Sequence, residues 1–300
     1  MRPSNGWPCV SRSSAIDYIL RPMPQARFTG TKFLPLVTVA LCIAIGFVPA
    51  VFRAATLRAV QTSTRKPPKA KPLAPAPRDL PMPFRVGEIL KYEVSWASFT
   101  TAASVELSVP ERRDLYGWRT WHFRATAHTV SPVRTLFAID DQFDSYTDAA
   151  TGESRQYENH LDEMGRKLEQ VWRFVPEGQT PRAPGAAVIV LPGTRDPLGA
   201  LYSLRAVDWQ RTPEVRMPVY DGHDLYEMRA RIEASSEAVE VPAGKFSASR
   251  IAIHVFQRNK EVSGIDFTVW LASDAARTPV VMAADLPFGS LRVEMQSANQ

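Results

Sequence analysis

From residue 33 to residue 52 the chain reads FLPLVTVALCIAIGFVPAVF, twenty residues without one charged side chain. A helix of this length, at about 1.5 Å rise per residue, spans roughly 30 Å, the thickness of the hydrocarbon core of a bilayer. Arg21, Arg27 and Lys32 precede it, as basic residues precede the apolar part of an export signal. We therefore expect residues 33–52 to form a signal peptide or membrane anchor, preceded by a basic region at residues 1–32.

Two outcomes are open for this segment after export. The run exceeds the usual apolar length of a cleaved signal, about 7–15 residues, which favours a retained anchor. Against this, Val48-Pro49-Ala50 offers plausible cleavage geometry. A buried core helix is disfavoured, because no other segment is apolar enough to surround it. We expect the remainder to be exported to the periplasm, either anchored in the inner membrane or released.

A Pro-rich linker follows at residues 53–83. Its last 19 residues, 65–83, contain 7 prolines, and proline at this density favours an extended, semi-rigid polyproline spacer. Both cysteines, Cys9 and Cys42, precede the linker. The exported part therefore has no cysteine with which to form a disulfide. The linker is expected to hold the next domain away from the membrane.

Charge divides the chain at the same point. Residues 1–83 hold 12 Lys/Arg and 2 Asp/Glu, a net charge of +10, which leaves 24 and 29 for residues 84–300, a net of −5. Nucleic-acid binders need a basic face on the folded module, so we expect no nucleic-acid partner. The basic leader instead suits contact with anionic lipid head groups.

The part from residue 84 onward alternates apolar and polar side chains, which is typical of strands with one buried face. For example, alternate positions of one predicted strand are occupied by Leu90, Tyr92, Val94 and Trp96, so these side chains should lie on the same face. The same pattern predicts about eleven or twelve strands. They are expected near residues 88–97, 103–109, 121–128, 140–147, 157–162, 167–175, 215–220, 226–232, 251–255, 265–271, 280–284 and 291–295.

The connections between these strands predict the architecture. Pro110 is expected to end the second strand, and a hairpin turn is expected at residues 163–166. One helix should run from Pro197 to about Ala206, capped by Asp196. Consecutive short strands imply an antiparallel sheet that is curled into a barrel or half-barrel. We therefore expect residues 84–300 to be one mainly β domain with one or two short helices.

The sequence offers no strong catalytic or metal-binding signature. No Gly-x-Ser-x-Gly elbow and no phosphate-binding loop occur. Glu158, His160 and Asp162 alternate along one predicted strand and could hold a metal ion, but solvent-facing strand polarity makes the same pattern. The acidic residues near 140–148 lack the Gly and Glu of a calcium loop. We predict no catalytic residue, no metal site and no cofactor.

Five short motifs stand in order along the domain: Phe84-x-Val86-Gly87-Glu88-x-Leu90-x-Tyr92, Asp141-x-Phe143-x-Ser145, Asp196-Pro197-Leu198 with Leu201-Tyr202-x-Leu204-Arg205, Val241-Pro242-Ala243-Gly244-x-Phe246, and Trp270-Leu271-x-x-Asp274-x-x-Arg277-x-Pro279. In this order they resemble the bacterial family called domain of unknown function 3108 (DUF3108), over about residues 84–297. The resemblance implies an envelope location and a β-rich fold. It implies no substrate, cofactor or catalytic residue.

Two motif arginines are the candidate site residues. Arginine is rarely buried without a partner, so Arg205 and Arg277 are each expected to hold a carboxylate such as Asp141 or Asp274. A structural ion pair is favoured over a clamp for an anionic ligand. These four positions are structural or ligand-binding candidates.

Three functions are compatible with these features. The first is a binding or carrier module of the cell envelope for an apolar ligand such as a lipid. The second is a structural or assembly protein whose sheet edges pair with other envelope proteins. The third is an enzyme of unrecognised class. A cavity of several hundred Å³ would favour the carrier, and a solid core with exposed edges would favour assembly.

The first prediction concerns export. A reporter that is active only outside the cytoplasm should work when fused after Pro83, because residues 33–52 direct the chain into the membrane. Cells that express the fusion are assayed for reporter activity. A second fusion, which lacks residues 33–52, is the control and should be inactive. Activity confined to a cytoplasm-dependent reporter would contradict the prediction.

Overall fold

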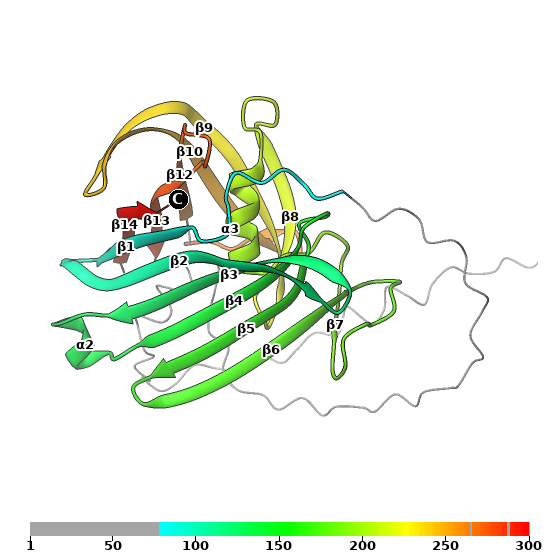
Figure 1. The fold of residues 1–300 in the computed structure, drawn as a ribbon. Coiled ribbons are helices and arrows are strands. Elements are labelled where there is room, and N and C mark those ends of the chain that lie inside the picture. Colours follow the sequence, from blue (N-terminus) through cyan, green and yellow to red (C-terminus); the bar gives the residue numbers. More distant parts are fainter. Residues whose placement is uncertain (1–77, 265, 287–288, 300) are drawn as a thin grey trace, which may run out of the picture. The chain divides into compact units, whose positions relative to one another are not determined.

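The computed structural model describes residues 78–264, 266–286 and 289–299 (Figure 1). The predicted signal or anchor at residues 33–52 lies outside this part of the chain, as does most of the Pro-rich linker. Among the described residues, no helix combines the length and the apolarity that crossing a membrane requires.

The described part is mainly β, with two short helices. Its elements are β1 (Ile89–Trp96), β2 (Phe99–Leu115), β3 (Trp118–Thr129), α2 (Val133–Leu136), β4 (Asp140–Asp148), β5 (Ser154–Glu163), β6 (Arg166–Pro176), β7 (Val188–Val190), α3 (Pro197–Ala206), β8 (Glu214–Tyr220), β9 (Leu225–Val241), β10 (Gly244–Gln257), β11 (Lys260–Glu261), β12 (Asp266–Ala272), β13 (Pro279–Leu286) and β14 (Gly289–Asn299). The expected helix is α3, and Asp196 caps it by accepting a hydrogen bond from Gly199 N at 2.8 Å.

The sheet consists of two runs of sequential strands that are joined through β1 and β14. Neighbours follow the order β7-β6-β5-β4-β3-β2-β1-β14-β13-β12-β10-β9-β8, and β11 pairs only with β10. Pairing is antiparallel throughout this path except between β6 and β7, which are parallel. The expected curled antiparallel sheet is thus confirmed in its main part, but the sheet is mixed.

The two ends of the sheet approach each other, so that the barrel is nearly closed. The segment before α3 bridges them: Thr194 O accepts from Ser154 N of β5 at 3.1 Å, and Arg195 N donates to Pro218 O of β8 at 2.9 Å. The Phe174 ring meets the Tyr220 ring edge-on, with centroids 5.6 Å apart. One short segment and a few side chains therefore close the barrel where no strand ladder does.

Helix α3 fills the interior of this barrel. Eight of its ten residues are buried: Pro197, Leu198, Gly199, Ala200, Leu201, Tyr202, Leu204 and Arg205. The Tyr202 ring stacks on Phe123 of β3 at 3.9 Å, and Phe84 meets Tyr202 edge-on at 5.1 Å. A helix surrounded by strands (Figure 1) needs apolar side chains on most of its circumference, and this sequence supplies them.

One detail of the second strand differs from the sequence-based expectations. Pro110 does not end a strand; it lies within β2, where the register with β3 shifts between Ser108 and Glu111. Proline is tolerated at such a bulge, because no ladder hydrogen bond is needed there. The hairpin at residues 163–166 is confirmed, with Gly165 at φ 77°.

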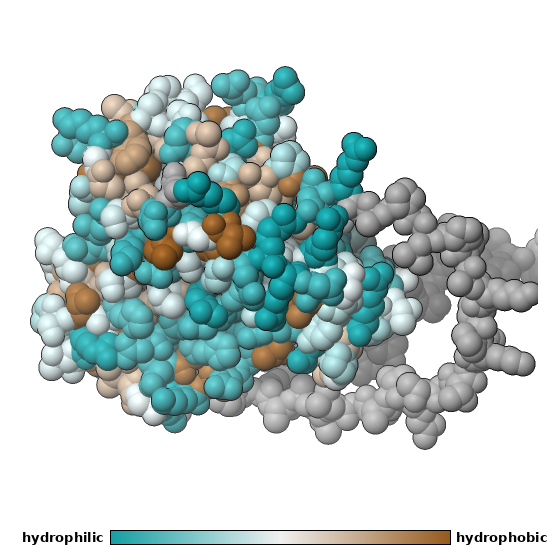
Figure 2. Space-filling view, in the orientation of Figure 1, coloured by the Kyte–Doolittle hydropathy of each residue, from teal (hydrophilic) through white to brown (hydrophobic). Residues whose placement is uncertain are grey.

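The face of the molecule shown in Figure 2 is mostly hydrophilic, and its hydrophobic residues form small separate spots. This distribution agrees with the alternation of side chains along the strands, which sends one set inward and the other to solvent. The apolar half of that pattern forms the core around α3.

The barrel is nearly closed where Gly222, in the turn between β8 and β9, packs against β6. This residue has φ +102°, and a Cβ there would lie 2.6 Å from Trp172 Cζ2 of β6. Gly222→Ala should lower the free energy of unfolding, measured by urea denaturation, by about 1–3 kcal/mol through overpacking, in addition to backbone strain.

Gly193→Ala is the matched control. Gly193 has φ +83°, and a Cβ there would have no neighbour within 4 Å. Its substitution therefore measures the backbone strain alone. If both variants lose equal stability, the contact between β6 and the β8–β9 turn does not constrain the fold.

Candidate functional site

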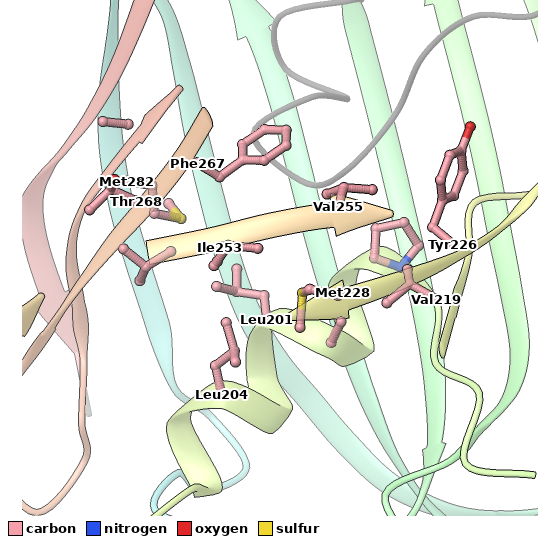
Figure 3. Close-up of a pocket in the computed structure, with 14 residues that line it drawn as sticks. Leu201, Leu204, Val219, Tyr226, Met228, Ile253, Val255, Phe267, Thr268 and Met282 are labelled. Atoms are coloured by element: carbon pink, nitrogen blue, oxygen red, sulfur yellow. The ribbon is translucent and has the colours of Figure 1, made fainter. Parts of the chain in front are cut away.

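A pocket lies between α3 and the half of the sheet built from β8 to β13 (Figure 3). In this view Leu201 and Leu204 project from α3 toward the strands that carry Met228 and Ile253. The residues that line it are Pro197, Ala200, Leu201, Leu204, Val219, Tyr226, Met228, Ile253, Val255, Phe267, Thr268, Val269, Met282 and Ala283.

Among the described residues that line this pocket none is charged, and the polar side-chain groups among them are the hydroxyls of Tyr226 and Thr268. The cavity has a volume of about 60 Å³. An apolar cavity of about 150 Å³ takes up one benzene molecule, so this smaller space holds only a small group or the end of an apolar chain. The pocket is therefore suited to hydrophobic contacts and offers few hydrogen bonds.

Tyr226 lines the pocket and carries a phenol hydroxyl. Burial, with a smaller contribution from the charges of Asp221 and Asp224, raises the pKa of Tyr226 to about 12. The phenol therefore stays neutral at physiological pH and can donate a hydrogen bond. This side chain is half-buried, so it can orient a polar end of an otherwise apolar molecule.

The sheet wall beside the pocket changes its pairing at Val255. Ile253 of β10 stands opposite Phe267 of β12, while Val255 O accepts from Val262 N at 2.9 Å and Phe256 stands opposite Glu261 of β11. The partner of β10 therefore passes from β12 to β11 beside the pocket.

At the C-terminal end of α3, Arg205 forms a buried ion pair with Glu88. Arg205 Nη1 donates to Glu88 Oε1 at 2.6 Å and Nη2 donates to Oε2 at 2.8 Å. Both side chains are 1% exposed. Arg205 Nη2 also donates to Ala276 O at 2.9 Å. A bidentate pair of this kind fixes both distance and orientation.

The surroundings of this pair favour the charged state of Arg205. Burial alone lowers the pKa of Arg205, but the hydrogen bond and the charge of Glu88 outweigh it and raise the pKa above its ordinary value. The guanidinium also lies over the rings of Phe84 and Tyr202, 5.2 Å from each centroid. These contacts identify the pair as a structural element of the core.

The expected partners of the two arginines are wrong in detail. Arg205 pairs with Glu88 instead of Asp141 or Asp274. Arg277 donates from Nη1 to the backbone O of Arg205 at 3.1 Å. Asp274 accepts from Thr278 N at 3.3 Å. Arg277 and Asp274 thus belong to the loop between β12 and β13, whose Ala276 O also meets Arg205.

A comparison of the sequence with models of protein families assigns this chain to a family. The model of the family described as "Protein of unknown function (DUF3108)" matches residues 91–296, more than half of the chain. The chain belongs to the DUF3108 family. The resemblance inferred from the five motifs is therefore confirmed, and the pocket wall at β9 to β13 and the helix α3 all lie within the matched part of this DUF3108 protein.

Three solved structures are similar to the DUF3108 chain. A β-barrel-like DUF1849 protein from Brucella abortus has a TM-score of 0.48 at 12% identity, over 71% of this chain and 97% of its own. A candidate exported protein with a YmcC-like fold from Bacteroides fragilis has a TM-score of 0.32 at 8% identity, over 74% of this chain and 100% of its own. A candidate lipoprotein from Parabacteroides distasonis has a TM-score of 0.36 at 11% identity, over 74% of this chain and 100% of its own. No curated protein matches.

Asp141 lies apart from the arginines, on β4. It is 1% exposed and accepts a hydrogen bond from Asp162 N at 3.0 Å. Burial, together with the charge of Glu163, raises the pKa of Asp141 to about 7. The structure therefore brings Arg205, Arg277 and Asp274 to one region of the DUF3108 domain and leaves Asp141 outside it.

The Glu88–Arg205 pair yields a stability prediction. Arg205→Ala should lower the free energy of unfolding by about 3–5 kcal/mol, because it leaves the Glu88 charge buried and unpaired. Arg205→Lys should retain only part of the stability that Arg205→Ala loses, since an ammonium cannot make the planar two-pronged contact. Urea denaturation of both variants measures the change.

A double-mutant cycle with Glu88→Ala is the control. The double variant should lose less stability than the sum of the two single losses, because neither charge is then left unpaired. Additive losses would contradict a direct interaction between the two side chains. If Arg205→Ala is as stable as the parent protein, the ion pair has no structural role.

Proposed function

We propose that this DUF3108 domain is a binding or carrier module of the cell envelope, and that it takes the end of an apolar chain, such as a lipid acyl chain, into the pocket between α3 and β8–β13. The observation that carries the proposal is the uncharged, almost wholly apolar lining of this pocket. Apolar contact of this kind favours ligands through removal of hydrocarbon surface from water, at about 25 cal/mol per Å².

The volume limits what can enter. About 60 Å³ is far below the roughly 300–1,000 Å³ of pockets that enclose a whole ligand, and below the several hundred Å³ expected for a carrier. The occupant is therefore a chain terminus. Met228 and Met282 line the pocket, and methionine side chains rearrange readily. Their movement supplies the additional room.

Envelope location rests on the sequence. The uncharged segment at residues 33–52 and the basic residues before it have the character of an export signal or anchor. The linker at residues 53–83 then holds the domain away from the membrane, within reach of its lipids. A retained anchor suits a stationary binder, and cleavage suits a carrier that moves.

Assembly through a sheet edge is the second candidate, because the edge strand β7 exposes Ile189 to 61%. Exposed strand edges pair readily with other chains. However, β7 is three residues long, and it therefore offers few backbone hydrogen bonds to a partner.

Binding of a fluorescent fatty acid with a conjugated tetraene chain tests the proposal. Leu201→Ala should enlarge the pocket and tighten binding at least threefold, as buried cavities bind apolar molecules. Val255→Trp should fill the pocket and weaken binding at least tenfold. Fluorescence titration of the full chain in detergent measures both affinities.

Leu107→Ala and Val171→Trp are the matched controls. Leu107 is buried in the core without lining the pocket, and Val171 is an exposed valine of β6. Neither should alter the affinity for the fatty acid. If the parent protein does not bind the probe, or if Leu201→Ala and Leu107→Ala bind it equally, the proposed function is wrong.

A further inference from the structure

A group of ionisable side chains lies on the outer face of β3, β4 and β5. In the sheet register Asp144 stands opposite Arg124 on β3 and opposite Glu158 on β5, and His160 stands opposite Gln142. Side chains of directly opposed residues lie on the same face and close together. This face is turned away from α3, because the alternate residues of these strands form the core.

Three of these residues converge on one point. Asp144, Glu158 and His160 each offer one ligand atom, and these atoms lie within 4.8 Å of one another. His160 Nε2 is 3.4 Å from Glu158 Oε2 and 3.9 Å from Asp144 Oδ2. Tetrahedral ligands at about 2.0–2.2 Å from a metal are roughly 3.3–3.6 Å apart. Small side-chain rotations therefore suffice to reach metal-binding distances.

The other oxygens of the two carboxylates are held by neighbours. Asp144 Oδ1 lies 2.5 Å from His122 Nε2 and accepts from Arg124 Nε at 2.8 Å. Gln156 donates to Glu158 Oε1. Such outer contacts orient ligands and leave Asp144 Oδ2 and Glu158 Oε2 facing His160. Gln142 Nε2 donates to Asp144 Oδ2 at 2.6 Å and lies at the same opening.

The two carboxylates of the group face a single arginine. Asp144 is 1% exposed and pairs with Arg124, whose Nε lies 2.8 Å from Asp144 Oδ1. Within the described part of the chain, the only ion-pair partner of Glu158 within 4 Å is His160, which is charged only when protonated.

We propose that Asp144, Glu158 and His160 form a site for a divalent transition-metal cation, with Zn²⁺ as its representative. Imidazole nitrogen and carboxylate oxygen are ligands that Zn²⁺ accepts, and three protein ligands leave a position open for water or another molecule. The His160 side chain is 37% exposed and that of Glu158 18%, so an ion can enter from solvent.

The sequence alone indicates two of the three ligands. Glu158, His160 and Asp162 alternate along one predicted strand, a pattern for which ordinary strand polarity is the favoured interpretation. In the structure Asp162 instead lies 3.5 Å from Lys167 Nζ. Asp144 takes its place because the β4–β5 register sets it opposite Glu158. No pattern within a single strand could reveal a ligand from the neighbouring strand.

Zn²⁺ binding to the full chain in mild detergent tests the proposal. After treatment with a chelator and its removal, calorimetric titration should show one Zn²⁺ per chain. His160→Gln and Glu158→Gln should each lower the affinity at least tenfold. Both side chains are partly exposed and both substitutions keep a polar group, so circular dichroism should match the parent.

His254→Gln is the matched control. His254 Nδ1 lies 2.8 Å from Glu261 Oε1, and its side chain is 44% exposed, so it is a histidine–carboxylate pair outside the three-residue cluster. Its loss should leave Zn²⁺ affinity unchanged. The proposal is overturned if the parent binds no stoichiometric Zn²⁺, or if His160→Gln binds it as tightly as the parent. In that case the three side chains form a polar cluster without a metal ion.

Discussion

The buried ion pair between Glu88 and Arg205 sets the geometry on which the rest of the barrel depends. Neither charge can remain in the core without the other, because an unpaired buried charge costs several kcal/mol. Glu88 directly precedes β1, Arg205 lies near the end of α3, and Ala276 O, which also accepts from Arg205, lies in the loop between β12 and β13. Three segments far apart in the sequence must therefore meet at one place.

This constraint also defines the pocket. Asp196 caps the first turn of α3 through Gly199 N and accepts hydrogen bonds from Ser145 and Ser154, while Arg205 fixes the last turn. The helix is thus held at both ends by buried polar contacts. An apolar chain that enters the pocket therefore has to displace side chains of the sheet wall, such as those of Met228 and Met282, and not the helix.

Much of the fold follows from the sequence, and the reasons for the failures are physical. Period-two alternation found most strands, and the Asp196 cap with Pro197 located α3, because both signals are local. Pro110 was misread as a strand end, since a bulge accommodates it within β2. The pairing of β1 with β14 joins opposite ends of the domain, and no local signal encodes it.

The candidate site was harder to predict for the same reason. Arg205 was recognised as needing a carboxylate, but its partner was sought at Asp141 and Asp274. Glu88 has the same parity as Leu90 and Tyr92, so the alternation already placed it on the inward face. A charged residue at an inward position needs a buried partner. Parity was therefore the signal that could have identified the pair.

The same alternation separates the two proposed sites. Along β3, β4 and β5 the inward residues pack around α3, and the outward residues include Asp144, Glu158 and His160. A one-residue slip between β4 and β5 would exchange the faces and bury the polar set in the core. The register that completes the apolar interior therefore also assembles the outer cluster. A metal ion there would lie on the opposite side of the sheet from α3, so it could stabilise this half of the barrel without entering the pocket.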